Sequence, residues 1–130
     1  MKPCILLVDD EPRIIEVLRI RLEESGFDVL AASNGEQGLE LARERRPSAM
    51  VLDLRMPGLS GFEVCEALRQ DPDLCRMPVI VLSANGDENT RRRAFDAGAS
   101  DFLPKPYNSL DVMASLRAVL RLEDRERLAG

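Results

Sequence analysis

The 130-residue sequence contains no histidine and no tryptophan, and it has a single tyrosine. Without histidine, the chain cannot itself carry a phosphohistidine or use an imidazole as a general base. Its three cysteines, Cys4, Cys65 and Cys75, are far apart and include no CxxC pair. This pattern argues against a zinc site and against a Cys/His nucleophile pair, and it favours reduced thiols.

Long apolar runs and an excess of basic residues are also missing. No apolar run approaches the ~20 residues that span a bilayer, and Met1-Lys2-Pro3 leads straight into a strand-like segment instead of a signal peptide. The formal net charge is −5, whereas nucleic acids and anionic membranes attract basic surfaces. We therefore expect a cytoplasmic protein that binds neither nucleic acid nor membranes directly.

Short apolar segments alternate with longer amphipathic ones. The apolar segments predict strands at residues 4–8, 27–31, 49–53, 79–82 and 101–103. Helical spacing predicts helices at about residues 12–26, 34–46, from 60 onward, 87–97 and from about 109 to beyond 120. Ser60 followed by Glu63 has the spacing of a capping box. Strict alternation predicts one α/β domain, a three-layer sandwich with a parallel sheet between helices.

Polar residues stand where the predicted strands end. Asp9 and Asp10 follow the first strand, and Asp53 closes the third. Ser83 follows the fourth strand and Lys105 the fifth. In open α/β sheets, ligands bind outside the carboxyl ends of the strands. We therefore expect these side chains to converge at one edge of the sheet.

Three carboxylates at one site would repel one another, and a divalent cation removes that repulsion. Oxygen ligands suit Mg²⁺, with Mn²⁺ as the alternative, and Mg²⁺ keeps waters that a phosphate can replace. An aspartate such as Asp53 can then act as a nucleophile and form an acyl phosphate. The Lys105 ammonium and the Ser83 hydroxyl would supply positive charge and a hydrogen-bond donor to the phosphoryl oxygens.

Four segments, in order and spread over residues 3–120, resemble the receiver domain of two-component response regulators of the chemotaxis-regulator type. They are Leu7-Val8-Asp9-Asp10-Glu11, Asp53 with Met56-Pro57-Gly58 and Gly61, Ser83-Ala84, and Gly98-Ala99 leading into Asp101-Phe102-Leu103-Pro104-Lys105-Pro106. The resemblance implies a flavodoxin-like, doubly wound parallel sheet of five strands in the order 2-1-3-4-5 with five helices.

The resemblance also implies roles for individual residues. Asp53 would be the phosphoacceptor, taking its phosphoryl group from a phosphohistidine of a sensor histidine kinase or a histidine phosphotransfer protein. The implied Mg²⁺ ligands are Asp10, Asp53, the backbone carbonyl of Arg55 and, through water, Asp9. Lys105, Ser83 and the backbone N–H of Ala84 would bind the phosphoryl group.

A conformational switch at Ser83 and Phe102 is implied as well, together with a cis peptide bond between Lys105 and Pro106. Because Phe102 lacks a hydroxyl group, burial of its ring would have to report the switch. Arg91, Arg92 and Arg93 are typical of a solvated helix face, but in this family the corresponding surface also contacts partners.

Simpler interpretations exist for several of these residues. The Asp9-Asp10-Glu11 acids could merely cap the following helix, whose macrodipole favours negative charge at that end. Ser83 could be an ordinary turn residue, and Phe102 is a core residue by default. A lone buried carboxylate at Asp53 has no comparable structural explanation, because burying an unpaired charge is costly.

Three other functions compete with the receiver interpretation. A Mg²⁺-dependent phosphohydrolase with an aspartyl phosphate would need a second aspartate two residues after Asp53, where this chain has Arg55. A nucleotide-binding module would need a GxGxxG or Walker A loop, which does not follow the first strand. A receiver-like scaffold that takes no phosphate is disfavoured because the acids and the lysine are all present. We expect that the protein is not an enzyme and that its chemistry is limited to its own phosphorylation and slow autodephosphorylation.

We expect a receiver domain at residues 1–122, followed by a charged segment at residues 123–130. This segment would be either a C-terminal tail or the start of a linker to an output domain. The downstream effector is not specified by any motif. Phosphorylation would shift a conformational equilibrium and so expose a surface for an effector or for a homodimer.

Overall fold

The computed structural model describes the backbone of residues 2–129 and the side chains of residues 2–121. Its five strands form one parallel sheet in the order β2-β1-β3-β4-β5. The strands are β1 (Cys4–Val8), β2 (Asp28–Ala32), β3 (Ala49–Asp53), β4 (Val79–Ser83) and β5 (Asp101–Pro104). The helices are α1 (Pro12–Glu24), α2 (Gly35–Arg45), α3 (Gly61–Gln70), α4 (Glu88–Asp96) and α5 (Ser109–Ala129). The predicted fold class and strand order are confirmed.

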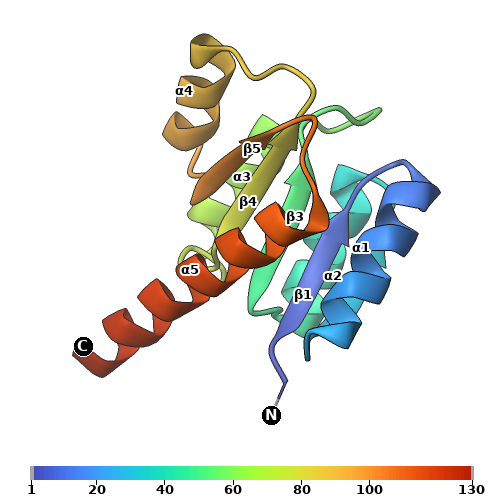
Figure 1. The fold of residues 1–130 in the computed structure, drawn as a ribbon. Coiled ribbons are helices and arrows are strands. Elements are labelled where there is room, and N and C mark those ends of the chain that lie inside the picture. The colour runs from blue at the N-terminus through green and yellow to red at the C-terminus, as the bar shows by residue number, and fades with distance from the viewer. Residues whose placement is uncertain (1, 130) are drawn as a thin grey trace.

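Helices cover both faces of the sheet, which is why the central strands are apolar throughout (Figure 1). In β1, Ile5 and Leu7 belong to a core that they share with α1 and α5. The alternate residues Leu6 and Val8 belong to a second core on the side of α2, α3 and α4. Since successive strand residues point to opposite faces, a strand between two helical layers needs an apolar residue at every position.

Local signals set the helix ends. Asn34 caps α2 by accepting a hydrogen bond from the Gln37 N–H at 2.8 Å. The predicted capping box is present at the start of α3, where the Ser60 and Glu63 side chains each bind the other's backbone N–H.

Several strand and helix boundaries differ from the prediction by one or two residues. Residue 27 was expected to open a strand, but the Phe27 N–H donates to the Leu22 carbonyl and so completes the C-terminal turn of α1. The second strand therefore begins at Asp28, which pairs with Cys4. At the other end of the chain, α5 continues to Ala129, in agreement with the predicted helix that runs beyond residue 120. The expected division at residue 122 thus falls within this helix and stays a prediction.

No helix in the described part of the chain combines the length and apolarity that crossing a membrane requires.

Replacing Ser60 with alanine should lower the free energy of unfolding by about 1 kcal/mol, the usual cost of losing an N-cap. The reason is that the Glu63 N–H loses its acceptor at 3.2 Å. Urea denaturation would measure the change, and Ser60→Asp, which retains a capping oxygen, should stay near the wild-type value. Equal losses in both variants would contradict a capping role.

Candidate functional site

Three carboxylates meet at the carboxyl edge of the sheet. Strands β1 and β3 are neighbours with Val8 opposite Leu52, so Asp9 and Asp53, the next residues on each strand, lie side by side. One carboxylate oxygen from each of Asp9, Asp10 and Asp53 lies within 4.8 Å of the other two. Asp9 and Asp53 are only 4% and 3% exposed, while Asp10 is exposed. The predicted convergence of these acids is therefore present.

One of the two Asp9 carboxylate oxygens is hydrogen-bonded, and the other has no partner among the described residues. Its Oδ1 accepts a hydrogen bond from the Glu11 N–H at 2.9 Å, while its buried Oδ2 has no hydrogen-bond partner among the described residues. Burial raises the pKa of this carboxyl from 3.8 to about 6, and the nearby Asp53 carboxylate adds to the rise. Glu11, the N-cap residue of α1, makes no side-chain capping bond. The Glu11 side chain therefore does not cap this helix.

Asp53 is held from two sides. Its Oδ1 accepts a hydrogen bond from the Arg55 N–H at 3.1 Å, and its Oδ2 lies 3.6 Å from the Lys105 Nζ. Burial raises the pKa of Asp53, and the Arg55 N–H and the Lys105 ammonium only partly oppose that rise. Burial therefore disfavours the ionised form of Asp53 more than its own donors favour it.

Lys105 reaches Asp53 from the loop that follows β5. Its backbone N–H donates to the Ser83 carbonyl at 2.7 Å, which fixes the start of that loop against the end of β4. The Lys105–Pro106 peptide bond is cis, as predicted.

These residues fit a divalent cation. The buried, unpartnered Asp9 Oδ2 is an oxygen that a metal ion or its bound water can satisfy. Three carboxylate oxygens within 4.8 Å of one another offer the hard, anionic donors that Mg²⁺ prefers.

Among the described residues, the predicted switch residues make no hydrogen bond with the three acids of the site. Ser83 is buried, and its hydroxyl donates to the Asn85 carbonyl at 3.0 Å and accepts from the Asn85 N–H at 3.1 Å. Ala84 is exposed beside it. Phe102 is 3% exposed in the core on the side of α2, α3 and α4. The simpler turn and core interpretations describe these contacts, and the switch stays a prediction.

The three arginines of α4 are exposed. The Arg91 guanidinium lies over the Phe95 ring, 5.1 Å from its centroid. The Arg93 guanidinium lies over the Phe62 ring of α3 at 4.2 Å. These contacts fix two of the three side chains locally, and a partner role for Arg91, Arg92 and Arg93 remains a prediction.

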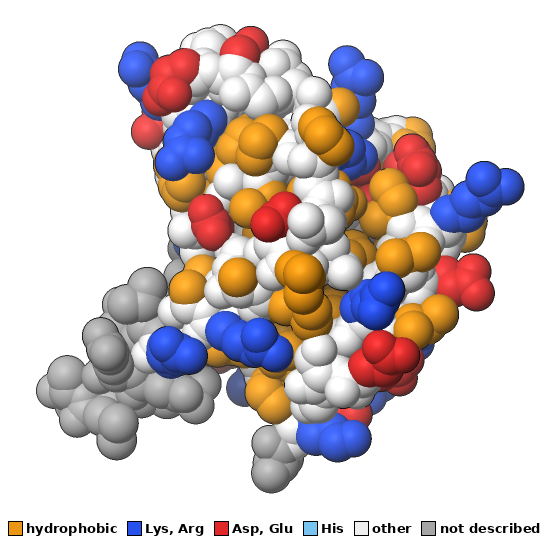
Figure 2. Space-filling model, in the orientation of Figure 1, with side chains coloured by type: hydrophobic (Ala, Val, Ile, Leu, Met, Phe, Trp, Pro, Cys, Tyr) orange, Lys and Arg blue, Asp and Glu red, His pale blue; other side chains and the backbone are white. Residues whose placement is uncertain are grey.

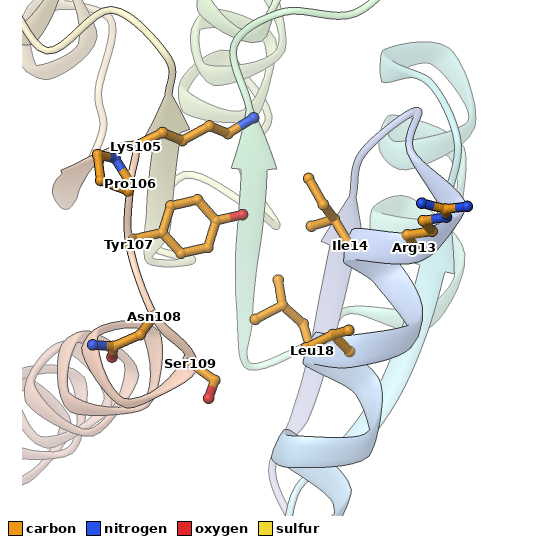
Figure 3. A pocket seen from close by; sticks show the side chains of 9 residues that line it. Arg13, Ile14, Leu18, Lys105, Pro106, Tyr107, Asn108 and Ser109 are labelled. Carbon is orange, nitrogen blue, oxygen red and sulfur yellow. The ribbon is translucent and has the colours of Figure 1, made fainter.

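An apolar groove opens beside Lys105, between α1 and the loop before α5. Its cavity of about 450 Å³ is lined by Arg13, Ile14, Val17, Leu18, Lys105, Pro106, Tyr107, Asn108 and Ser109. Figure 3 shows Tyr107 pointing across the groove toward α1, below the Lys105 side chain. Figure 2, which views the α1 and α5 side of the molecule, shows hydrophobic side chains gathered between these helices.

The sequence reasoning did not single out Tyr107. Burial raises the pKa of its phenol to about 12, and the carboxylates of Asp9, Asp53 and Glu11 contribute to that rise. The available signal was its place two residues after Lys105, because a side chain so near a functional lysine is held close to the same site.

The chain matches the family model described as "Response regulator receiver domain" over residues 5–117. It is 41% identical over 95% of its length to the DNA-binding transcriptional regulator RpaA of Synechocystis, and covers 51% of that protein. It is 39% identical over 99% of its length to the phosphate regulon regulatory protein PhoB of Rhizobium meliloti, and covers 57% of it. The chain thus spans about half the length of these curated relatives.

A solved structure extends the likeness to the fold. The receiver domain of a sensor histidine kinase from Pseudomonas aeruginosa, with a magnesium ion coordinated in its active-site cleft, has a TM-score of 0.84 and 29% identity to this chain. The match covers 92% of this chain and 98% of that domain.

The buried Asp9 carboxylate should make metal-free stability depend on pH. Its folded-state pKa lies above the unfolded value, so its contribution is present below about pH 4 and is lost as pH rises through about 6. Asp9→Asn should therefore become more stable than the wild type as pH rises from 4.5 to 7.5, by about 3 kcal/mol at most. Urea denaturation in the presence of EDTA would measure the difference in unfolding free energy between the variant and the wild type. A difference that did not change with pH would contradict the raised pKa of Asp9.

Proposed function

The chain belongs to the response regulator receiver family of two-component signalling systems, and on this premise we propose that Asp53 is its phosphoacceptor. The observation that carries the proposal is the environment of this one carboxylate. Asp53 is 3% exposed, its Oδ2 lies 3.6 Å from the Lys105 Nζ, and the carboxylates of Asp9 and Asp10 lie beside it. The other buried acid among the described residues, Asp9, also lies beside two acids but has no cation within ion-pair distance.

Asp9, Asp10, Asp53 and the Arg55 backbone carbonyl would hold Mg²⁺, with Mn²⁺ as the alternative. The ion would supply positive charge that offsets the clustered carboxylates and the charge on transferring phosphoryl oxygens. The magnesium ion in the Pseudomonas aeruginosa receiver domain supports this assignment.

In the proposed reaction an Asp53 oxygen attacks the phosphorus of a phosphohistidine. A P–O bond forms while the P–N bond to the donor's imidazole breaks, and the electron pair leaves on the imidazole nitrogen, which takes up a proton from water. The Arg55 N–H keeps the Asp53 carboxylate oriented through its Oδ1. Lys105 neutralises the unmodified carboxylate and would then bind a phosphoryl oxygen.

The proposed switch follows from the same transfer. The Ser83 hydroxyl would leave Asn85 and, with the Ala84 N–H, donate to phosphoryl oxygens. Phe102 would report the change by its burial, because it has no hydroxyl of its own. The surface of α4 that carries Arg91, Arg92 and Arg93 would then be available for an effector or for a second copy of the chain.

A phosphohydrolase is the weaker alternative. It would need an acid two residues after Asp53, and Arg55 occupies that position with an exposed side chain and its N–H on Asp53. We therefore propose that the domain turns over only its own aspartyl phosphate.

The phosphodonor would be a sensor histidine kinase or a histidine phosphotransfer protein, acting in the cytoplasm. Because the named relatives are transcriptional regulators about twice as long as this chain, a receiver domain at residues 1–122 that controls an output domain beyond residue 123 is consistent with them.

The apolar groove is the surface at which we propose that the donor protein docks. It is lined by Lys105, which contacts Asp53, and by exposed parts of α1 such as Val17, which is 56% exposed. A donor helix seated there would bury apolar side chains while its phosphohistidine approaches the acidic cluster.

Incubation with acetyl phosphate and Mg²⁺ should add one phosphoryl group to the wild-type chain, visible in its intact mass. Asp53→Asn should gain none, because the nucleophile is lost, and EDTA should abolish the gain in the wild type. Repeated turnover of a phosphate ester, or an unmodified wild-type chain, would refute the proposal.

Val17→Glu should slow transfer from a phosphohistidine protein by about tenfold, equivalent to ~1.4 kcal/mol, because it places a charge in the groove. Ile20→Glu is the matched control, since Ile20 is 49% exposed on the same helix and does not line the groove. Both variants should react with acetyl phosphate at the wild-type rate. Equal slowing by both substitutions would exclude the groove as the docking surface.

A further inference from the structure

The loop between β3 and α3, residues 54–60, carries the Arg55 carbonyl and is held at both of its sides. At its base, the Gly61 N–H donates to the Leu54 carbonyl at 3.3 Å, and the Arg55 N–H donates to Asp53. On its far side, the loop lies against the first turn of α2, where Glu36 stands.

Glu36 contacts two successive residues of this loop. Its Oε1 accepts a hydrogen bond from the Leu59 N–H at 3.2 Å. The backbone of Gly58 turns there with φ of +81°, and a Cβ atom on that residue would lie 3.0 Å from the same oxygen. Glycine suits this turn because it adopts positive φ without strain and leaves room for the carboxylate.

Gly35, the residue before Glu36 in α2, also lies close to the loop. A Cβ atom on Gly35 would lie 3.0 Å from the Leu59 carbonyl oxygen and 2.9 Å from the Val64 Cγ2 of α3. The start of α2 is therefore packed directly on the loop, so the Glu36 hydrogen bond joins two backbones that are already in contact.

We infer that Glu36 is a positioning residue for the metal site, which it serves by fixing the loop that presents the Arg55 carbonyl. The inference rests on the proposed function, because it takes this carbonyl as a Mg²⁺ ligand. Mg²⁺ demands near-ideal octahedral geometry, so a ligand on a loose loop costs ordering free energy when the ion binds. Glu36 lowers that cost by holding the loop beforehand.

The negative charge of Glu36 offers a rival explanation, since any nearby carboxylate attracts a cation. Glutamine separates the two, because its amide oxygen can accept the same Leu59 hydrogen bond without the charge. Glu40 supplies a second control, as it is an exposed acid on the same helix and makes no hydrogen bond or ion pair with the loop among the described residues.

The experiment compares Mg²⁺ affinity, by titration calorimetry, in the wild type and in Glu36→Ala, Glu36→Gln and Glu40→Ala. Outer-shell partners typically contribute 10–100-fold to metal affinity; since Glu36 is exposed, we expect a loss of roughly three- to tenfold for Glu36→Ala. Glu36→Gln and Glu40→Ala should stay within about twofold of the wild type, as expected where contact rather than charge matters.

A second readout needs no metal. Hydrogen exchange at the Leu59 amide, measured in EDTA, should be faster in Glu36→Ala than in the wild type and should be restored in Glu36→Gln. Wild-type Mg²⁺ affinity in Glu36→Ala, or equal losses in the alanine and glutamine variants, would overturn the inference while leaving the proposed function intact. A wild-type chain that binds no Mg²⁺ would overturn the proposed function and this inference together.

Discussion

Burial of two carboxylates side by side is the constraint on which the rest of the site depends. Asp9 and Asp53 are both nearly inaccessible, and each receives one backbone N–H bond. Of the two, only Asp53 has a cation within ion-pair distance among the described residues. Burying uncompensated charge is costly, so the fold accepts a local loss of stability at this edge. Positive charge placed beside these carboxylates would recover that loss.

The sheet order produces this concentration of charge. The chain runs from β1 outward to β2 and then returns to β3 on the other side of β1, so the loops after β1 and β3 diverge and leave an opening between them. Asp9 and Asp53 flank that opening. Lys105 comes from β5, two strands beyond β3, and its long side chain spans the distance. Acidic residues that follow or end the adjacent strands β1 and β3 can therefore share one site with a lysine that follows the more distant strand β5.

Much of this was predictable from the sequence, because the signals are local. Continuous apolar segments marked the strands, Ser60 and Glu63 marked a helix start, and polar residues at strand ends marked the edge that holds the acids. The strand order came from the resemblance. Tyr107 in the groove and the Glu36–Leu59 contact were not predicted. The place of Tyr107 two residues after Lys105 was an available signal, whereas the Glu36–Leu59 contact depends on how closely two distant segments approach, which no periodicity or spacing in the sequence encodes.

Ser83 illustrates how a satisfied contact can still belong to a switch. Its hydroxyl forms two neutral hydrogen bonds with Asn85, each contributing about 1 kcal/mol net. A bond to an anionic phosphoryl oxygen is roughly twice as strong as a neutral one, so in the proposed switch a phosphoryl group on Asp53 would compete for the one proton that this hydroxyl donates to Asn85. The Ser83 carbonyl meanwhile binds the Lys105 N–H. A change at Ser83 would therefore act on the loop before α4 and on the loop that carries Lys105 at the same time.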